Sequence, residues 1–402
     1  MQDIADLADR APDVVRRFAY RVAEGRGVAG RFADAVRFRF SADEIPSVPE
    51  ISEAPVRLVI GPADSAGQAF GWARAAERGL PGVTALSVRE VGADPFRLDV
   101  DLRVPVAVYQ RSTTWHRAFE DFLRGQTHVV WESGLPLLGR RYRSVADERQ
   151  ILARAGVTGA LLFHGSDIRP PARHAAQSEW SPFHTETGRV RALEDGAVRN
   201  AALARSFPGP VFVSTPDLLQ WLPDSTWCPV VVDPAMWSGR APSRRAGRMP
   251  VVAHAPSQAW LKGTERIEPI LRRLESEGLI EYRRIVGVPH ASMPDFYAGA
   301  DIVLDQFVLG IYGVAACEAM AAGCLVMSHV DAFTRAAVRE RTALDLPIHE
   351  TTVETLETEL RLVVGDPAAF DRERAAGPAF VDAVHDGRRS AEALAPFLGL
   401  TG

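Results

Sequence analysis

The fold of this chain is decided by the stretch Asp301-Ile-Val-Leu-Asp305-Gln306-Phe-Val-Leu-Gly310-Ile-Tyr-Gly313-Val-Ala-Ala-Cys-Glu318-Ala-Met-Ala-Ala-Gly323-Cys-Leu-Val-Met327. An apolar run, a glycine loop, a helix of small residues, a glycine stop and a second apolar run follow one another, which is typical of a parallel sheet. Gly310 and Gly313 allow the backbone to approach a ligand closely, and the helix that follows directs its unpaired N–H groups at that ligand. The stretch therefore predicts an anion site, with a diphosphate as the natural occupant.

Lys262 is the only lysine among 46 Lys and Arg residues. It lies in His254-Ala-Pro-Ser-Gln-Ala-Trp-Leu-Lys262-Gly263-Thr264, directly after an apolar run over residues 250–253. An ammonium is a compact point charge that can be directed onto one phosphate oxygen, whereas a guanidinium binds as a planar fork. Lys262 is therefore predicted to meet an anion; the alternative is a solvated surface cation that persists by chance.

Glu318 lies about a turn and a half into the helix that follows Gly313. From there its carboxylate could accept a hydrogen bond from a ribose hydroxyl. An ordinary solvated helix residue is the alternative. However, the small apolar neighbours at 319–322 indicate a helix buried against a sheet, where a carboxylate needs a partner.

These motifs resemble the nucleotide-binding half of the family 4 glycosyltransferases, which are retaining enzymes with the two-domain GT-B fold. In that family a Lys-Gly follows the first strand, which matches Lys262-Gly263, and a Glu-x7-Glu motif runs into Ala-Met-Ala-x-Gly, which matches Glu318 to Gly323. The resemblance extends over roughly residues 55–400. It implies that Lys262 neutralises the donor diphosphate, that Glu318 holds the ribose, and that loop amides bind the sugar and phosphate. The implied donor-binding residues are Gly67, Ser257, Asp305, Gln306, Gly310, Ile311, Tyr312 and Gly313.

Two positions depart from the family pattern. Gly310 stands where the family has the first Glu of its motif, so the carboxylate that would touch the transferred sugar is absent. Asp305 and Gln306 are the candidates for its role. The family's Arg shortly before Lys262 is also absent, because residues 256–260 are Pro-Ser-Gln-Ala-Trp.

Apolar runs recur along the rest of the chain with helical stretches between them. This pattern predicts an α/β protein with two Rossmann-like, doubly wound domains that face each other across a cleft. The predicted strands cover residues 56–60, 83–88, 104–109, 128–131, 159–163 and 210–214 in the first domain, and 250–253, 282–288, 302–304 and 325–327 in the second.

The predicted boundaries follow from the same pattern and from a Pro-rich connector before residue 55. A helical extension and linker occupy 1–54, an acceptor-side domain 55–233, a hinge 234–249 and a nucleotide-sugar domain 250–380. By the family resemblance, a helix over 381–402 crosses back to the first domain. Two internal helices have start signals: Ser144 with Asp147 for a helix over 144–155, and Thr264 as the N-cap of the next.

Polar residues after the strands of the first domain are the candidates for acceptor binding, because ligands of open α/β sheets bind at the carboxyl ends of strands. The loop 61–68 ends in Gly67 and Gln68 at a helix start, which suits an anion or the acceptor. His164 ends an apolar run and is followed by Gly165, so it is predicted to point into the cleft. It resembles the family's active-site His, which hydrogen-bonds the transferred sugar; a local backbone contact is the alternative. The remaining candidates are Trp115, Glu132, Asp167 and Arg169, the last two of which could also pair with each other.

Composition limits the other functions. A net charge of −5 argues against nucleic-acid binding, and three cysteines without a Cys-x-x-Cys pair predict neither disulfides nor a zinc site. No apolar run approaches the roughly 20 residues that span a bilayer, and no signal peptide is evident, so a cytoplasmic protein is expected. Eight arginines between Arg10 and Arg39 favour a solvated basic helix; the alternative is a peripheral contact with the inner face of a membrane.

The sequence thus predicts a glycosyltransferase that moves a sugar from a UDP- or GDP-type donor to an acceptor hydroxyl with retention. His164, Lys262 and Glu318 are its predicted catalytic residues. Neither a metal nor any cofactor besides the nucleotide sugar is expected, and the acceptor is a glycan, a lipid-linked sugar or a small molecule. The alternatives are a non-catalytic GT-B protein that binds a sugar nucleotide and, third, a sugar-nucleotide epimerase.

Overall fold

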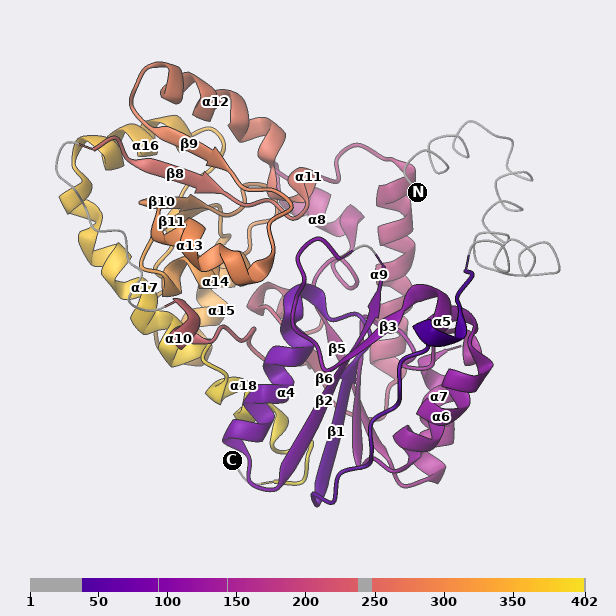
Figure 1. The fold of residues 1–402 in the computed structure, drawn as a ribbon. Helices are drawn as coiled ribbons and strands as arrows, with labels where there is room; N and C mark the ends of the chain where they lie inside the picture. Colours follow the sequence, from indigo (N-terminus) through magenta and orange to yellow (C-terminus); the bar gives the residue numbers. More distant parts are fainter. Residues whose placement is uncertain (1–37, 93, 143, 238–247, 401–402) are drawn as a thin grey trace, which may run out of the picture.

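Two parallel sheets form the centres of two lobes that face each other (Figure 1). The computed structural model describes residues 38–92, 94–142, 144–237 and 248–400. The first sheet has the strand order β3-β2-β1-β4-β5-β6-β7 and the second has the order β12-β11-β10-β8-β9. All described strand pairs are parallel. The predicted α/β class with two such sheets is confirmed.

The strands are short and mostly buried. In the first lobe they are β1 (Val56–Gly61), β2 (Val83–Val91), β3 (Leu102–Pro105), β4 (His128–Glu132), β5 (Thr158–Phe163), β6 (Val211–Val213) and β7 (Thr226–Trp227). In the second lobe they are β8 (Val251–His254), β9 (Glu281–Arg284), β10 (Ile302–Leu304), β11 (Leu325–Ser328) and β12 (His349–Glu350).

Helices connect the strands and cover the sheets. In the first lobe they are α4 (Gln68–Gly79), α5 (Val106–Arg111), α6 (Thr113–Arg124), α7 (Val145–Arg154), α8 (Pro171–Gln177) and α9 (Gly188–Ser206). The chain continues with α10 (Pro234–Trp237), α11 (Ala259–Lys262), α12 (Thr264–Ser276), α13 (Met293–Ala298), α14 (Val314–Ala321), α15 (Ala332–Thr342), α16 (Leu356–Gly365), α17 (Asp371–Val384) and α18 (Arg388–Leu394).

Both faces of the first sheet are buried, because successive side chains of a strand point to opposite faces. Leu58 and Ile60 of β1 pack with Trp72 of α4 in one apolar cluster, whereas Val59 between them packs with Phe119 of α6 in another. Burial on both faces explains why these strands are continuous apolar runs rather than alternating ones.

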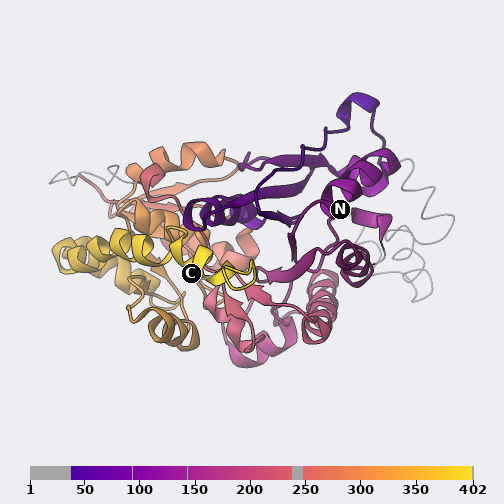
Figure 2. The same ribbon diagram turned by 90° about the horizontal axis from the view of Figure 1, so that it is seen from below.

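The end of the chain connects the two lobes. α17 packs against α14 in the second lobe, and α18 packs against α4 in the first. Figure 2 shows this yellow segment running from one lobe onto the other. The backbone N–H of Val232 donates to the carbonyl of His385 at 2.8 Å, which ties the crossing point to the end of the first lobe.

Three local predictions were wrong. The predicted strand 104–109 is a strand only to Pro105 and continues as α5, since Pro105 cannot donate to a ladder and β3 is an edge strand. The predicted strand 282–288 ends at Arg284, before Gly287. Gly263, with a φ of 73°, precedes α12 as its cap instead of Thr264, whose hydroxyl hydrogen-bonds His254. By contrast, Ser144 caps α7 by accepting from the N–H of Asp147, as predicted.

Two sequence predictions fall outside the described residues. The basic segment from Arg10 lies almost wholly within residues 1–37, and most of the predicted hinge lies within 238–247. Within the part that the structure describes, no helix is long and apolar enough to cross a membrane.

Candidate active site

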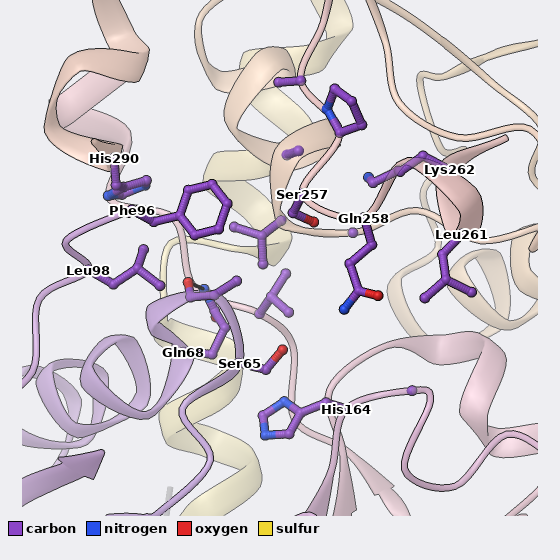
Figure 3. A pocket seen from close by; sticks show the side chains of 18 of the residues that line it. Ser65, Gln68, Phe96, Leu98, His164, Ser257, Gln258, Leu261, Lys262 and His290 are labelled. Carbon is purple, nitrogen blue, oxygen red and sulfur yellow. Dashed lines mark hydrogen bonds between the residues drawn. The ribbon is translucent and has the colours of Figure 1, made fainter. Parts of the chain in front are cut away.

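A cavity of about 590 Å³ lies between the two lobes. Figure 3 shows His164 and Lys262, from different lobes, on opposite sides of it. The carboxyl ends of β1, β5, β8 and β10 all lead into loops that line this cavity, as expected for ligand sites in open α/β sheets. Nine of the predicted site residues line it: Gln68, His164, Arg169, Ser257, Lys262, Gln306, Ile311, Gly313 and Glu318.

The loop between β10 and α14 turns its carbonyls towards the protein. The carbonyl of Leu309 accepts from His174 Nε2 at 3.2 Å, that of Gly310 accepts from the N–H of Asp331 at 2.9 Å, and that of Ile311 accepts from Gln306 Nε2 at 2.8 Å. These contacts fix the path of the loop from three directions.

The N–H groups of the same loop are left for a ligand. Those of residues 311–315 have no acceptor among the described residues, and all of these residues except Tyr312 line the cavity. The N-terminal end of α14 adds its positive dipole at the same point. A row of unpaired N–H groups at a helix start is a binding site for an anion such as a phosphate.

Lys262 ends α11 and brings a positive charge to this cavity. Its ammonium pairs with Asp305, and its carbonyl accepts from the N–H of Phe307 at 3.1 Å. His254 holds the segment that carries Lys262 in place. Its Nδ1 donates to the carbonyl of Leu304 at the end of β10, and its Nε2 accepts from the hydroxyl of Thr264 at the start of α12. Burial lowers the pKa of His254 to about 4, which keeps this imidazole neutral.

Glu318 is buried in α14 and has a partner that the sequence did not reveal. His290 Nε2 donates to Glu318 Oε1 at 2.7 Å, which leaves the other carboxylate oxygen for a ligand. This hydrogen bond raises the pKa of His290 above its usual value of 6.5. His290 is in turn held by Phe96 of the first lobe, whose carbonyl accepts from the His290 N–H at 2.8 Å.

This pair predicts a pH dependence. Because the folded-state pKa of His290 is raised by Glu318, with a smaller contribution from Asp99, its stabilising effect is complete below pH 6.5 and is lost as the pH rises through the raised value. The free energy of unfolding of His290→Gln, which keeps a hydrogen-bond donor but does not titrate, should therefore fall less steeply above pH 6.5 than that of the unchanged protein. Urea unfolding at a series of pH values measures both slopes, and identical slopes would contradict the assignment.

The first lobe contributes a buried cluster of a histidine and two acids. His164 Nε2 donates to Glu132 Oε1 at 2.9 Å, and Glu132 Oε2 accepts from the N–H of Asp64 at 2.8 Å. Although burial alone would lower it, the hydrogen bond and charge of Glu132 raise the pKa of His164. Burial and the neighbouring Glu132 raise the pKa of Asp64 to about 7. Asp64 was not predicted as a site residue from the sequence. The only signal that could have identified it is its position in the loop 61–68.

Several predicted ligands have other tasks. Gln68 lines the cavity, but its amide group exchanges two hydrogen bonds with the backbone of Val231. Arg169 forms an ion pair with Asp217, not with Asp167, and both partners are buried. Asp167 instead accepts from the backbone N–H groups of His164 and Gly165 and shapes that loop.

The other predicted site residues do not line the cavity. Trp115 is 1% exposed and stacks on Phe119 in the core, with ring centroids 4.7 Å apart. The hydroxyl of Tyr312 donates to His385 Nε2 at 3.2 Å beneath the loop. Gly310 has a φ of 67°, and a Cβ atom there would lie 3.1 Å from that of Asp331. Gly67 caps α4. Glu132 accepts a hydrogen bond from His164, Asp167 holds the loop that begins at His164, and Asp305 pairs with Lys262.

Comparison with family models and with curated protein sequences gave no match. Solved structures match over most of the chain. A sucrose-phosphate synthase from Thermosynechococcus elongatus is 12% identical with a TM-score of 0.53, and the match covers 85% of this chain and 97% of that one. HepE from Anabaena with UDP-glucose is 12% identical with a TM-score of 0.53, over 86% and 99%. An alpha-glucosyltransferase with UDP and DNA is 8% identical with a TM-score of 0.53, over 86% and 99%.

At these identities the likeness defines the fold. The two facing parallel sheets match the GT-B fold of these solved glycosyltransferases, which is the fold that the sequence motifs predicted.

Proposed function

We propose that the chain is a glycosyltransferase that transfers a sugar from a nucleoside diphosphate sugar of the UDP or GDP type to an acceptor hydroxyl. The observation that carries the proposal is the row of unpaired N–H groups over residues 311–315, in a cavity that also holds Lys262. These groups suit the two negative charges of the diphosphate in a nucleotide sugar. They would stabilise the charge that develops on it as the glycosidic bond breaks.

The solved structures support the choice of ligand. Those similar to this chain include HepE with UDP-glucose and an alpha-glucosyltransferase with UDP. The motifs around Lys262 and Glu318 resemble those of family 4, whose members retain the anomeric configuration.

In the proposed complex each lobe has its own task. Lys262 and the loop N–H groups hold the diphosphate, and the free oxygen of Glu318 accepts from a ribose hydroxyl. His164, fixed by Glu132, would hydrogen-bond the transferred sugar from the opposite lobe. The acceptor hydroxyl attacks the face that the leaving group vacates and gives its proton to the departing diphosphate oxygen, so we propose transfer with retention, with Lys262 in the place of a metal ion.

A direct test measures release of UDP and GDP from a panel of UDP- and GDP-sugars. Slow hydrolysis of at least one donor, with the first sugar released in the donor's own anomeric configuration by proton NMR, is the expected result. Inverted product would contradict retention. Binding of UDP or GDP without turnover on any donor and acceptor would exclude the transferase.

A second candidate is a non-catalytic protein that binds a sugar nucleotide. It is favoured by Gly310, whose positive φ of 67° would strain any side chain and whose Cβ would lie 3.1 Å from that of Asp331, so that the carboxylate that the family places there is disfavoured. Saturable binding without turnover would support it. Entry of solvent deuterium into the sugar would instead identify the third alternative, an epimerase.

Replacement of Glu318 by Ala is expected to weaken binding of UDP or GDP by about 1–3 kcal/mol, because a buried hydrogen bond to the ribose is lost. Isothermal titration calorimetry measures the change. Glu340→Ala is the matched control, since Glu340 lies exposed on α15 and, within the described part of the chain, pairs only with its neighbour Arg341. Equal affinities of the two variants would refute the ribose contact.

A further inference from the structure

A segment of the first lobe packs on the second lobe. It consists of residues 171–190, which comprise α8, the following turn and the start of α9, and we call it the clasp. Figure 1 shows α8 beside α11, where the two lobes meet. The clasp is a second connection between the lobes, separate from the crossing of α17 and α18.

The turn of the clasp is bound at its tip. Trp180 Nε1 donates to Glu354 Oε2 at 2.5 Å, and its ring lies against that of His329, with centroids 4.6 Å apart. The carbonyl of Trp180 accepts from Arg266 Nη1 at 3.3 Å. These three partners all belong to the second lobe, so the turn is anchored there.

The end of the clasp packs on the segment that carries Lys262. The guanidinium of Arg189 lies 4.3 Å from the ring centroid of Trp260 and donates to Gln258 at 2.9 Å. Phe183 packs on the same indole from another side, with ring centroids 5.8 Å apart. The clasp thus supports the loop of the second lobe that carries Lys262 into the cavity.

His174 is the buried centre of this contact. Its Nε2 lies 3.2 Å from the carbonyl oxygen of Leu309 in the second lobe, and its Nδ1 lies 2.7 Å from the hydroxyl of Ser181 within the clasp. A carbonyl can only accept, so Nε2 carries the proton and Nδ1 accepts from Ser181. Burial, with the charge of Arg169, lowers the pKa of His174 to about 4, so the imidazole stays neutral and keeps this arrangement.

The hydrogen bond between His174 and Leu309 affects the loop that begins two residues further along the chain, at Ile311. Leu309 immediately precedes Gly310, whose positive φ turns the chain, and the cavity-facing loop of residues 311–315 follows directly. Drawing the carbonyl of Leu309 towards the clasp therefore sets the direction of the turn that exposes the N–H groups of this loop.

We propose that His174 is a positioning residue of the anion site: it acts from the opposite lobe, through the carbonyl of Leu309, to hold the N–H groups of residues 311–315 towards the ligand. The ligand class rests on the proposed function, whereas the effect of His174 on the loop does not. Anion binding is thereby coupled to the contact that His174 forms between the two lobes.

The test compares three variants. His174→Phe keeps an aromatic ring beside Phe183 but loses both hydrogen bonds, whereas His174→Gln restores a donor close to the position of Nε2. His184→Phe is the matched control, because His184 is exposed and its hydrogen bonds go to the carbonyls of Ser178 and Glu179 within the clasp. Calorimetry with UDP and GDP gives the affinity. The N–H of Phe307 donates to the carbonyl of Lys262, and that of Asp331 donates to the carbonyl of Gly310. The rates of hydrogen exchange at these two amides therefore measure the stability of the loop in the absence of ligand.

His174→Phe should weaken binding of the nucleoside diphosphate about 10-fold and speed exchange of both amides, while His174→Gln stays within about threefold of the unchanged protein. The control should match the unchanged protein in both measurements. Unchanged exchange in His174→Phe, or equal effects of Phe and Gln, would overturn the inference. If neither UDP nor GDP binds the unchanged protein, the proposed function fails, and the exchange rates alone decide the inference about His174.

Discussion

Replacing Lys262 with Met should lower the turnover of a nucleotide sugar by about 10²–10³-fold, the usual cost of removing one group that stabilises transition-state charge. Methionine reaches as far as Cε of the lysine, with sulfur in place of Cδ, and lacks the ammonium. The loss is expected in kcat as well as in affinity for the donor, because negative charge increases on the diphosphate as the bond breaks. Steady-state kinetics on the best donor measure both.

The ion pair with Asp305 requires a control in this experiment. Asp305 is 2% exposed, so Lys262→Met leaves a buried carboxylate without its cation and should also destabilise the fold. The double variant Lys262→Met, Asp305→Asn should recover stability but not turnover. Recovery of turnover in the double variant would show that Lys262 acts only on Asp305 and would contradict its contact with the donor.

Removal of Arg169 or of Asp217 should each destabilise the chain by about 3–5 kcal/mol, the typical cost of leaving one buried charge without its partner. Arg169 Nη2 lies 2.5 Å from Asp217 Oδ2, and the two side chains are 2% and 0% exposed. Among the described residues, Arg169 Nε and Asp217 Oδ1 have no other hydrogen-bond partner, so little else can compensate.

A double-mutant cycle tests this pair. Arg169→Met and Asp217→Leu are made singly and together, and the free energy of unfolding is measured in urea. The double variant should be more stable than either single variant, because apolar residues of similar volume leave no buried charge. Additive losses would show that the two charges do not depend on each other. Since Arg169 also lines the cavity, donor turnover in the same variants separates its structural effect from any contact with the ligand.

Local patterns were sufficient for much of the fold. The apolar runs at 302–304 and 325–327 are β10 and the start of β11, because strands buried on both faces must be continuously apolar. Ser144 marks the start of α7 because a hydroxyl can satisfy a free N–H of the first turn. These features depend on residues within one element, and such residues are close in sequence.

The positions of several site residues instead depend on how helices and strands pack against one another, because this packing decides whether a side chain faces the core or the cavity. Trp115 was predicted at the site from its position in a loop after a strand, and Tyr312 by the family resemblance, yet both point into the core. Conversely, nothing near Glu318 in sequence indicated His290, which lies 28 residues away and is brought to it by the packing of the second lobe.

Local sequence motifs thus predicted the strand, glycine loop and helix around Gly313, the importance of Lys262 and the class of fold. Each of these predictions depends on residues that are close together in the sequence. Docking of the lobes decided the rest. The contact between His174 and Leu309 joins residues 135 positions apart, and the cluster of Asp64, Glu132 and His164 joins three strand ends. Such contacts form only when separate buried surfaces meet, and the free energy that selects them belongs to the assembled core rather than to any single segment.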